Sequence, residues 1–131
     1  MKIRNGFVSN SSSSSFLVGF PRKLKSVEQV QRLLFGDKEL IFHDFGTSTA
    51  ESLAKHVFEE MKLVEDLEAA YKHLEDVSWH VSNGVNLTDL LAVKEKYQWY
   101  EGSFEDKGST TAIEVDDVPF QGLLYAKFNQ H

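Results

Sequence analysis

The spacing of apolar residues predicts at least two short helices. In residues 27–34 the apolar side chains recur every three or four positions, as they do on one face of a helix. Ser26 stands at the N-cap position of this helix, and Gln29 three residues later completes a capping box. Gly36 suits the left-handed position that follows a helix. Asn86 predicts the start of another helix, because its side chain can cap the first turn.

The longest helical pattern covers residues 48–77, where no glycine or proline occurs. One apolar stripe runs through it, and Ser48 with Glu51 forms a capping box at its start. A single helix of about 28 residues would be about 42 Å long at 1.5 Å per residue, which is long for a domain of this size. Two helices that break near residues 62–66 are the alternative, and the pattern leaves both possibilities open.

Compact or alternating apolar runs predict the strands. Residues 16–20 read as a strand that is buried on both faces, and residues 40–42 as a second, shorter strand. Residues 97–104 and 110–115 are rich in aromatic and β-branched side chains and are separated by a turn signal. We therefore expect these two segments to form a β-hairpin. Residues 123–128 predict the last strand.

These segments together predict a single domain of the α+β class. We expect a mixed, mainly antiparallel sheet, formed by the five apolar segments and covered by three or four helices. The 131 residues suffice for one core, and contents of 41% apolar and 26% charged residues are typical of a globular protein. The globular domain would span residues 16–131, and residues 1–15 would form a serine-rich, basic segment before it.

Charge is distributed unevenly along the chain. The net charge is −6, which disfavours general binding to nucleic acids. Residues 1–25 contain five basic side chains and no acidic one, whereas residues 26–131 contain nine basic and twenty acidic side chains. The basic segment therefore either packs against the acidic body or meets an anion or an acidic partner.

The absence of some residue types and motifs excludes several kinds of site. The chain has no cysteine, which excludes disulfides, thiolate metal sites and cysteine nucleophiles and fits a reducing compartment. No apolar run approaches the roughly 20 residues of a membrane-spanning helix. Neither a His-Glu-x-x-His motif nor a Gly-Lys-Ser/Thr phosphate loop occurs. We therefore expect no cofactor, no metal site and no membrane association.

A weaker set of residues leaves a chemical role open. Successive backbone N–H groups and hydroxyls of a serine-rich loop can hold an anion. Glu114, Asp116 and Asp117 cluster beside a turn, although their spacing matches no calcium loop. With His43 and nearby carboxylates, the serine-rich loop gives the alternative hypothesis of a small enzyme or a nucleotide- or anion-binding domain.

Aromatic residues gather between Tyr97 and Phe104. In a strand, Tyr97 and Trp99 would lie on one face, with Tyr100 and Phe104 on the other. One of these faces belongs to the core. The other is either an exposed aromatic patch that suits a protein partner or a second buried face covered by helices. Trp99 and Tyr100 are therefore candidate interaction residues.

The most unusual stretch is residues 6–20, in which five consecutive serines stand between two apolar runs. Serine is a poor helix former because its hydroxyl competes for nearby backbone groups, so we expect a loop or extended chain. Phenylalanines on either side of the tract would anchor it. The candidate interaction residues of this stretch are Phe7, Ser11, Ser12, Ser13 and Phe16.

From Arg4 to Phe16 the chain reads RNGFVSNSSSSSF. This string resembles the N-terminal motif of many small uncharacterised proteins of tailed bacteriophages and some bacteria. The resemblance covers residues 1–18 and implies a phage or prophage accessory protein that acts in the cytoplasm of the bacterial host. It carries over no catalytic residue. We therefore expect a non-enzymatic protein that binds a host or phage protein.

The resemblance leaves the role of the serine tract open. It can be an address that another protein reads. It can be a site of phosphorylation, which would reverse the basic charge of the segment. It can also be a structural loop whose hydroxyls satisfy backbone groups.

Overall fold

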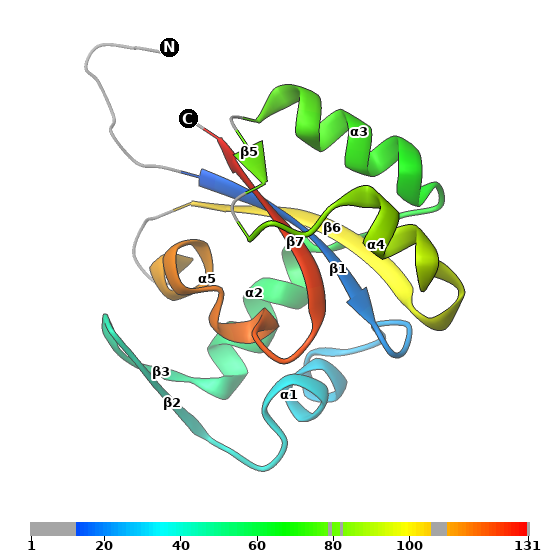
Figure 1. Cartoon of the computed structure of the whole chain (residues 1–131). Coiled ribbons are helices and arrows are strands. Elements are labelled where there is room, and N and C mark those ends of the chain that lie inside the picture. Colours follow the sequence, from blue (N-terminus) through cyan, green and yellow to red (C-terminus); the bar gives the residue numbers. More distant parts are fainter. Residues whose placement is uncertain (1–12, 79, 82, 106–109, 131) are drawn as a thin grey trace, which may run out of the picture.

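The sheet of the protein is built around β1 (Ser13–Phe20), a strand that begins inside the serine tract. The computed structural model describes residues 13–78, 80–81, 83–105 and 110–130. Within it, β1 pairs antiparallel with β6 (Gln98–Glu105) along one edge and with β7 (Leu124–Gln130) along the other. The three long strands run side by side through the middle of the molecule (Figure 1).

Two strands of two residues each complete the sheet, in the order β4-β6-β1-β7-β5. β4 (Lys62–Leu63) pairs with β6, and β5 (His80–Val81) pairs with β7, both antiparallel. The side chain of Asn83 continues along the edge of β7 next to β5. Its amide donates to the carbonyl oxygen of Tyr125 at 2.6 Å and accepts from the backbone N–H of Lys127 at 3.3 Å.

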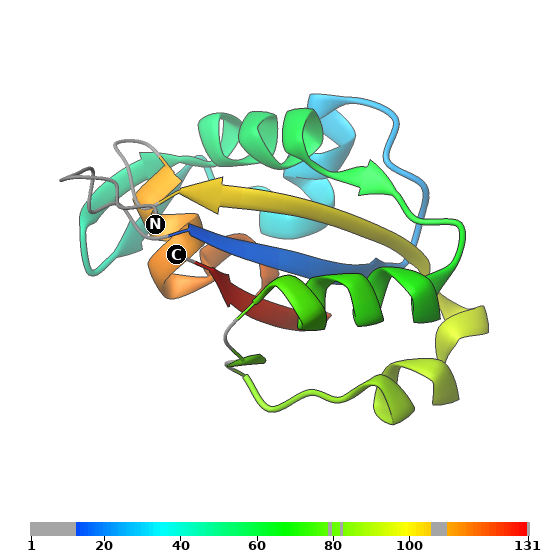
Figure 2. The same ribbon diagram turned by 90° about the horizontal axis from the view of Figure 1, so that it is seen from above.

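Helices cover both faces of this sheet (Figure 2). One face is covered by α1 and α2, with α5 beside them, and the opposite face by α3 and α4. The described residues thus form one α+β domain with a mainly antiparallel sheet, as predicted, and with five α-helices where three or four were expected. The helices are α1 (Val27–Phe35), α2 (Ala50–Glu60), α3 (Leu67–Val77), α4 (Leu87–Ala92) and α5 (Thr111–Asp116). None of the helices in the described ranges is long and apolar enough to cross a membrane.

β1 sends side chains into both layers of the core. Phe16 and Phe20 pack in the cluster under α1 and α2, where the Phe16 ring centre lies 4.9 Å from that of Phe120. Leu17 packs in the opposite cluster with Trp99. All residues of β1 after Ser13 are buried, which confirms the prediction of a strand buried on both faces. Each fully buried side chain of this size stabilises the fold by about 1.5–3 kcal/mol.

Side-chain caps begin the helices close to the predicted positions. The Ser26 hydroxyl accepts from the Gln29 N–H at 3.1 Å, and Asn86 caps α4 in the same way. Gly36 has a φ of 61° after α1, as its position predicted. For α2 the cap is Thr49, the last residue of β3, rather than Ser48: the Thr49 hydroxyl accepts from the N–H of Ser52 at 3.1 Å, whereas the Ser48 hydroxyl is hydrogen-bonded to His43.

The segment of residues 48–77 forms two helices, so the alternative with a break is confirmed. α2 ends at Glu60, and β4 follows before α3 begins at Leu67. The chain leaves the helix here because Lys62 and Leu63 pair with the edge of β6. Asp66 then accepts from the N–H of Ala69 at 3.1 Å and caps α3.

The predicted β-hairpin of residues 97–104 and 110–115 is wrong. The first segment forms β6, but residues 111–116 form the helix α5. Ala112 and Ile113 are 2% and 0% exposed, and Ile113 packs in the cluster with Phe104 and Phe120. The two edges of β6 pair with β1 and β4. Tertiary burial of these side chains therefore overrides the strand preference of the segment.

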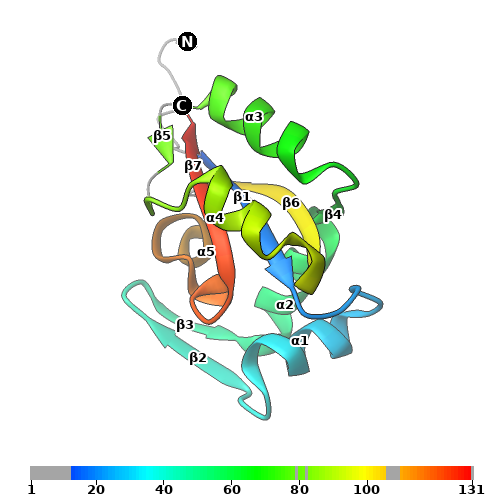
Figure 3. The same cartoon turned by 45° about the vertical axis from the view of Figure 1, so that its right-hand side comes forward.

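Residues 40–42 form a strand, but the prediction that this strand joins the main sheet is wrong. β2 (Leu40–His43) pairs antiparallel with β3 (Gly46–Thr49) in a separate two-stranded sheet. The chain reverses at residues 44–45, and Gly46 has a φ of 122° that favours glycine. The resulting hairpin stands at the periphery of the molecule, away from the main sheet (Figures 1 and 3).

Candidate functional site

One face of the β2–β3 hairpin exposes apolar side chains. The register pairs Leu40 with Thr49 and Phe42 with Thr47, and paired residues lie on the same face of a sheet. Leu40 is 50% exposed and Phe42 is 76% exposed. Phe45, in the turn of the hairpin, is 53% exposed. These residues, Leu40, Phe42, Phe45, Thr47 and Thr49, are called the hairpin surface below.

The other face of the hairpin holds it against the body of the protein. Ile41 packs against the core cluster under α1 and α2. The ring of His43 bonds within the hairpin, because its Nδ1 accepts from the N–H of Phe45 at 3.2 Å. Its Nε2 therefore carries the proton of the neutral ring and donates to Ser48 Oγ at 2.8 Å. The exposed face is thus presented by a hairpin that is fixed from behind.

The concentration of apolar side chains on the hairpin is unusual for this molecule. Six large apolar side chains in the described ranges are exposed, and three of them lie in residues 40–45. The others, Leu63, Val77 and Val115, belong to three different elements. Single exposed apolar residues are common on protein surfaces, whereas a group of them marks an interaction site.

A groove runs along β2. Its volume is about 490 Å³, and it is lined by the end of α1, by residues of β2 and by residues 118–122. Leu34, Phe35 and Pro119 are apolar members of its lining, and Lys38 and Asp44 are charged ones. The hairpin surface therefore adjoins a hollow that is both apolar and charged.

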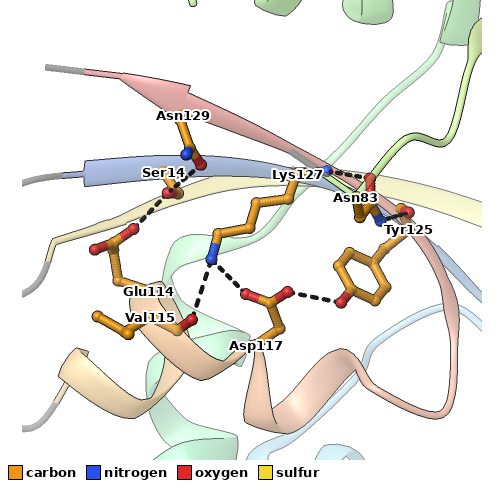
Figure 4. A network of polar contacts seen from close by, with 8 residues as sticks. All are labelled: Ser14, Asn83, Glu114, Val115, Asp117, Tyr125, Lys127 and Asn129. Carbon is orange, nitrogen blue, oxygen red and sulfur yellow. Dashed lines mark hydrogen bonds and ion pairs between the residues drawn. The ribbon is translucent and has the colours of Figure 1, made fainter. Parts of the chain in front are cut away.

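The serine tract itself enters a buried polar network beneath α5 (Figure 4). Ser14 donates from its hydroxyl to the carboxylate of Glu114, and Asn129 Oδ1 lies 3.3 Å from the same hydroxyl. Ser14 is 0% exposed and Glu114 is 5% exposed. A buried carboxylate is stable only with such partners, so this contact ties α5 to the central strand.

A second part of the network ties the end of α5 to β7 (Figure 4). Lys127 Nζ lies 2.6 Å from Asp117 Oδ1, and the two side chains are only 10% and 17% exposed. The Tyr125 hydroxyl donates to Asp117 Oδ2 at 2.7 Å. Burial, followed by this hydrogen bond, raises the pKa of Tyr125 well above its usual value, so the phenol remains a donor. The ammonium group also lies 5.5 Å from the centre of the Phe16 ring.

The network acts as a clamp between α5 and the sheet. A serine nucleophile needs an open approach for its substrate, and full burial of Ser14 closes that approach. Ser15 lies on the opposite face of β1, where its hydroxyl is 2.6 Å from that of Ser103. Ser14 and Ser15 thus serve packing through specific polar partners.

The candidate aromatic residues lie in the core rather than on a surface. Phe16 is 0% exposed, and Trp99 and Tyr100 are each 5% exposed. Trp99 Nε1 donates to the carbonyl oxygen of Lys94 at 3.0 Å, and the Tyr100 hydroxyl accepts from the N–H of Leu24 at 2.9 Å. Of the two alternatives for this strand, burial on both faces is therefore the correct one. An exposed aromatic patch built on Trp99 or Tyr100 is not formed.

The remaining candidates are placed apart from one another. Ser13 begins β1 and is half-buried, opposite Glu105 on one side and Gln130 on the other. His43 bonds within the hairpin, whereas Glu114 bonds to β1. Phe7, Ser11 and Ser12 lie outside the described residues, so their roles stay predictions.

The hairpin surface is the feature that the sequence reasoning missed. The compact apolar run of residues 40–42 predicts a strand of the main sheet and does not indicate an exposed face. The signal for a hairpin was the turn before Gly46 and the run Thr47-Ser48-Thr49, whose β-branched residues favour a strand. A two-stranded sheet at the periphery buries only one of its faces, and here Leu40 and Phe42 lie on the other.

Neither a metal cluster within the described residues nor a match to a known family identifies the function of the chain. Within the described ranges, His, Asp and Glu side chains form no group of three or more that could hold a metal ion. No protein-family model matches the chain, and neither a curated protein nor a solved structure does. The surfaces of this chain therefore have to indicate its function.

Proposed function

We propose that the protein is a non-enzymatic accessory protein of the phage type that binds a host or phage protein through the hairpin surface. The observation that carries this proposal is the exposure of Leu40, Phe42 and Phe45 on one peripheral hairpin. The resemblance of residues 4–16 to the N-terminal motif of phage proteins supports the biological setting.

The energetics of the hairpin surface favour a protein partner. Covering a large apolar side chain contributes about 1.5–3 kcal/mol, which corresponds to about 10- to 100-fold in affinity. Phe42 has the most area to lose to a partner, because it is the most exposed large apolar side chain among the described residues. Few residues carry most of the energy of a typical interface, and aromatic anchors are frequent among them.

The architecture of the hairpin suits this role. Its inward face is fixed by Ile41 and by the bond between His43 and Ser48. A partner therefore meets a surface that is already formed, and little conformational entropy is lost on binding. Thr47 and Thr49 add short polar side chains next to the two apolar ones.

Affinity capture from infected bacterial cells tests the proposal. The bait is the full-length protein, compared with Phe42→Ser and with the control Val77→Ser. Val77 is also exposed, at 51%, but lies on α3. We expect the wild type and Val77→Ser to retain the same partner and Phe42→Ser to lose it. Equal retention by all three, or no retained protein with the wild type, would contradict the proposal.

A further inference from the structure

β2 has one strand partner and one open edge. It pairs with β3, and no other described strand pairs with it. The backbone N–H of Ala50 donates to the carbonyl oxygen of Glu39 at 2.9 Å. This hydrogen bond shows which residues of β2 direct their backbone groups towards β3. Because backbone groups alternate along an antiparallel strand, Leu40 and Phe42 direct their N–H and C=O groups to the open edge.

The groove beside β2 lies at this open edge. It is lined both by Ile41, whose side chain faces the body, and by Phe42, whose side chain faces solvent. A hollow that touches residues of both faces must lie at an edge of the strand. None of its lining residues belongs to β3, so the edge is the one opposite β3. The groove therefore leaves space beside Phe42 at this edge, and Leu40, which is 50% exposed, lies two residues before it along the strand.

We propose that the open edge of β2 pairs antiparallel with the same edge of a second copy of this chain. A two-fold axis would pass at Ile41. Leu40 of one copy then faces Phe42 of the other, and the outward backbone groups of both residues form hydrogen-bonded pairs. The proposal rests on the proposed function. It extends that function, because it names a second copy of this chain as one partner of the hairpin.

The positions of two charged residues favour this register over registers that are shifted along the strand. With Ile41 on the two-fold axis, Lys38, two residues before β2, comes near Asp44 of the second copy, which directly follows β2, and the contact occurs twice. Both side chains are exposed and free to meet a second copy without being withdrawn from the core. A register shifted by two residues would place Lys38 opposite Phe42, or Asp44 opposite Leu40.

The side chains of the outward face fit the same arrangement. Leu40 of each copy would lie next to Phe42 of the other, and four apolar side chains would form one continuous patch. A two-stranded sheet by itself is marginal in water, whereas a four-stranded sheet is of common size. The pairing therefore enlarges the hairpin surface and leaves its apolar face open to the partner of the proposed function.

An interface formed by one short strand from each copy is small. Interfaces of this size belong to the weak class, so the dimer should form and dissociate with concentration. Sedimentation velocity of the full-length protein from about 1 μM to 1 mM spans this range of affinity. We expect a monomer at the low end and a dimer at the high end.

Charge reversal tests the register. Lys38→Asp places two acidic side chains together at each end, and Asp44→Lys places two basic side chains there. Each variant alone should dimerise at least about tenfold more weakly than the wild type. An equimolar mixture of the two variants should recover the dimer, because every contact of the mixed dimer again joins opposite charges. Lys55→Asp, at an exposed position of α2, is the control and should dimerise like the wild type.

Amide hydrogen exchange gives a second readout without any substitution. The N–H groups of Leu40 and Phe42 should be protected only at concentrations where the dimer forms. The N–H of Ile41, which points to β3, should be protected at all concentrations. Circular dichroism of the variants checks that they are folded.

Three results would overturn the inference: a wild type that stays monomeric, single variants that dimerise like the wild type, or exchange at Leu40 and Phe42 that does not depend on concentration. The proposed function is scored separately, because Lys38→Asp keeps the hairpin surface. If monomeric Lys38→Asp still captures the cellular partner, the proposed function holds without the dimer. If the wild type dimerises but captures no other protein, only the inference about the second copy holds.

Discussion

β1 and β2 both contain leucine and phenylalanine, but they lie in opposite environments. β1 is paired along both edges and covered on both faces, so even its serines at positions 14 and 15 are buried. β2 is paired along one edge and covered on one face, so Phe42 remains 76% exposed. Serines of β1 are therefore inside the protein, whereas Leu40 and Phe42 of β2 are outside.

Position in the sheet, rather than the composition of the strand, therefore decides which side chains are buried here. A buried hydroxyl without a partner costs about 1–3 kcal/mol, and Ser14 avoids this cost through Glu114. An exposed phenylalanine gains nothing for the stability of the fold. Its presence at Phe42 therefore needs another explanation, and binding is the one that its chemistry supports.

The free energy of unfolding should respond very differently to substitution of Phe16 and of Phe42. Phe16→Ala should lower the free energy of unfolding by about 3–5 kcal/mol, because it leaves a cavity beside Phe104 and Phe120. Phe42→Ala should change it by less than about 0.5 kcal/mol, since the side chain is mostly in water. Urea unfolding measures both. Similar losses for the two variants would contradict the assignment of one residue to stability and the other to binding.

A smaller change in the free energy of unfolding tests the clamp between α5 and the sheet. Ser14→Ala removes a donor from the buried carboxylate of Glu114 and should cost about 1–3 kcal/mol of unfolding free energy. Ser13→Ala, one residue earlier at the half-buried start of the strand, is the matched control and should cost less than about 0.5 kcal/mol. If Ser13 proved the more sensitive of the two in urea unfolding, the clamp would be assigned to the wrong serine.

The smallest effect concerns pH. Burial and the hydrogen bond to Asp117 raise the pKa of Tyr125 above the ordinary value of 10.0. Above pH 10 the unfolded chain loses a proton that the folded protein still holds, so the free energy of unfolding falls as the pH rises. This contribution is fully present below pH 10. Tyr125→Phe should flatten the fall between neutral and alkaline pH, as followed by thermal unfolding. An unchanged slope would show that other groups cause it.

Local signals in the sequence predicted much of the fold. The caps at Ser26 and Asn86, the turn at Gly36 and the two-sided burial of residues 16–20 depend on neighbours within a few residues. The break within residues 48–77 was an open alternative because a single helix of about 42 Å is long for a domain of this size. These features can be inferred without knowing which distant segments meet.

The errors arise where distant segments decide. The partner of Ser14 is 100 residues away, and the partner of Ser15 is 88 residues away, so neither contact could be predicted from the serine tract. Residues 110–115 have the composition of a strand, but Ile113 is buried as part of a helix. The hairpin surface was missed for the same reason, because the apolar character of residues 40–42 does not reveal which strand they pair with.

Asn83 limits how far copies of this protein can assemble. Its amide occupies backbone groups at the edge of β7, so that stretch offers no template for a strand from another molecule. Pairing of β2 with itself about a two-fold axis uses the same edge of both copies and leaves neither of these edges exposed. Association through this edge of β2 would therefore end at a closed pair, without growth into fibres along that edge.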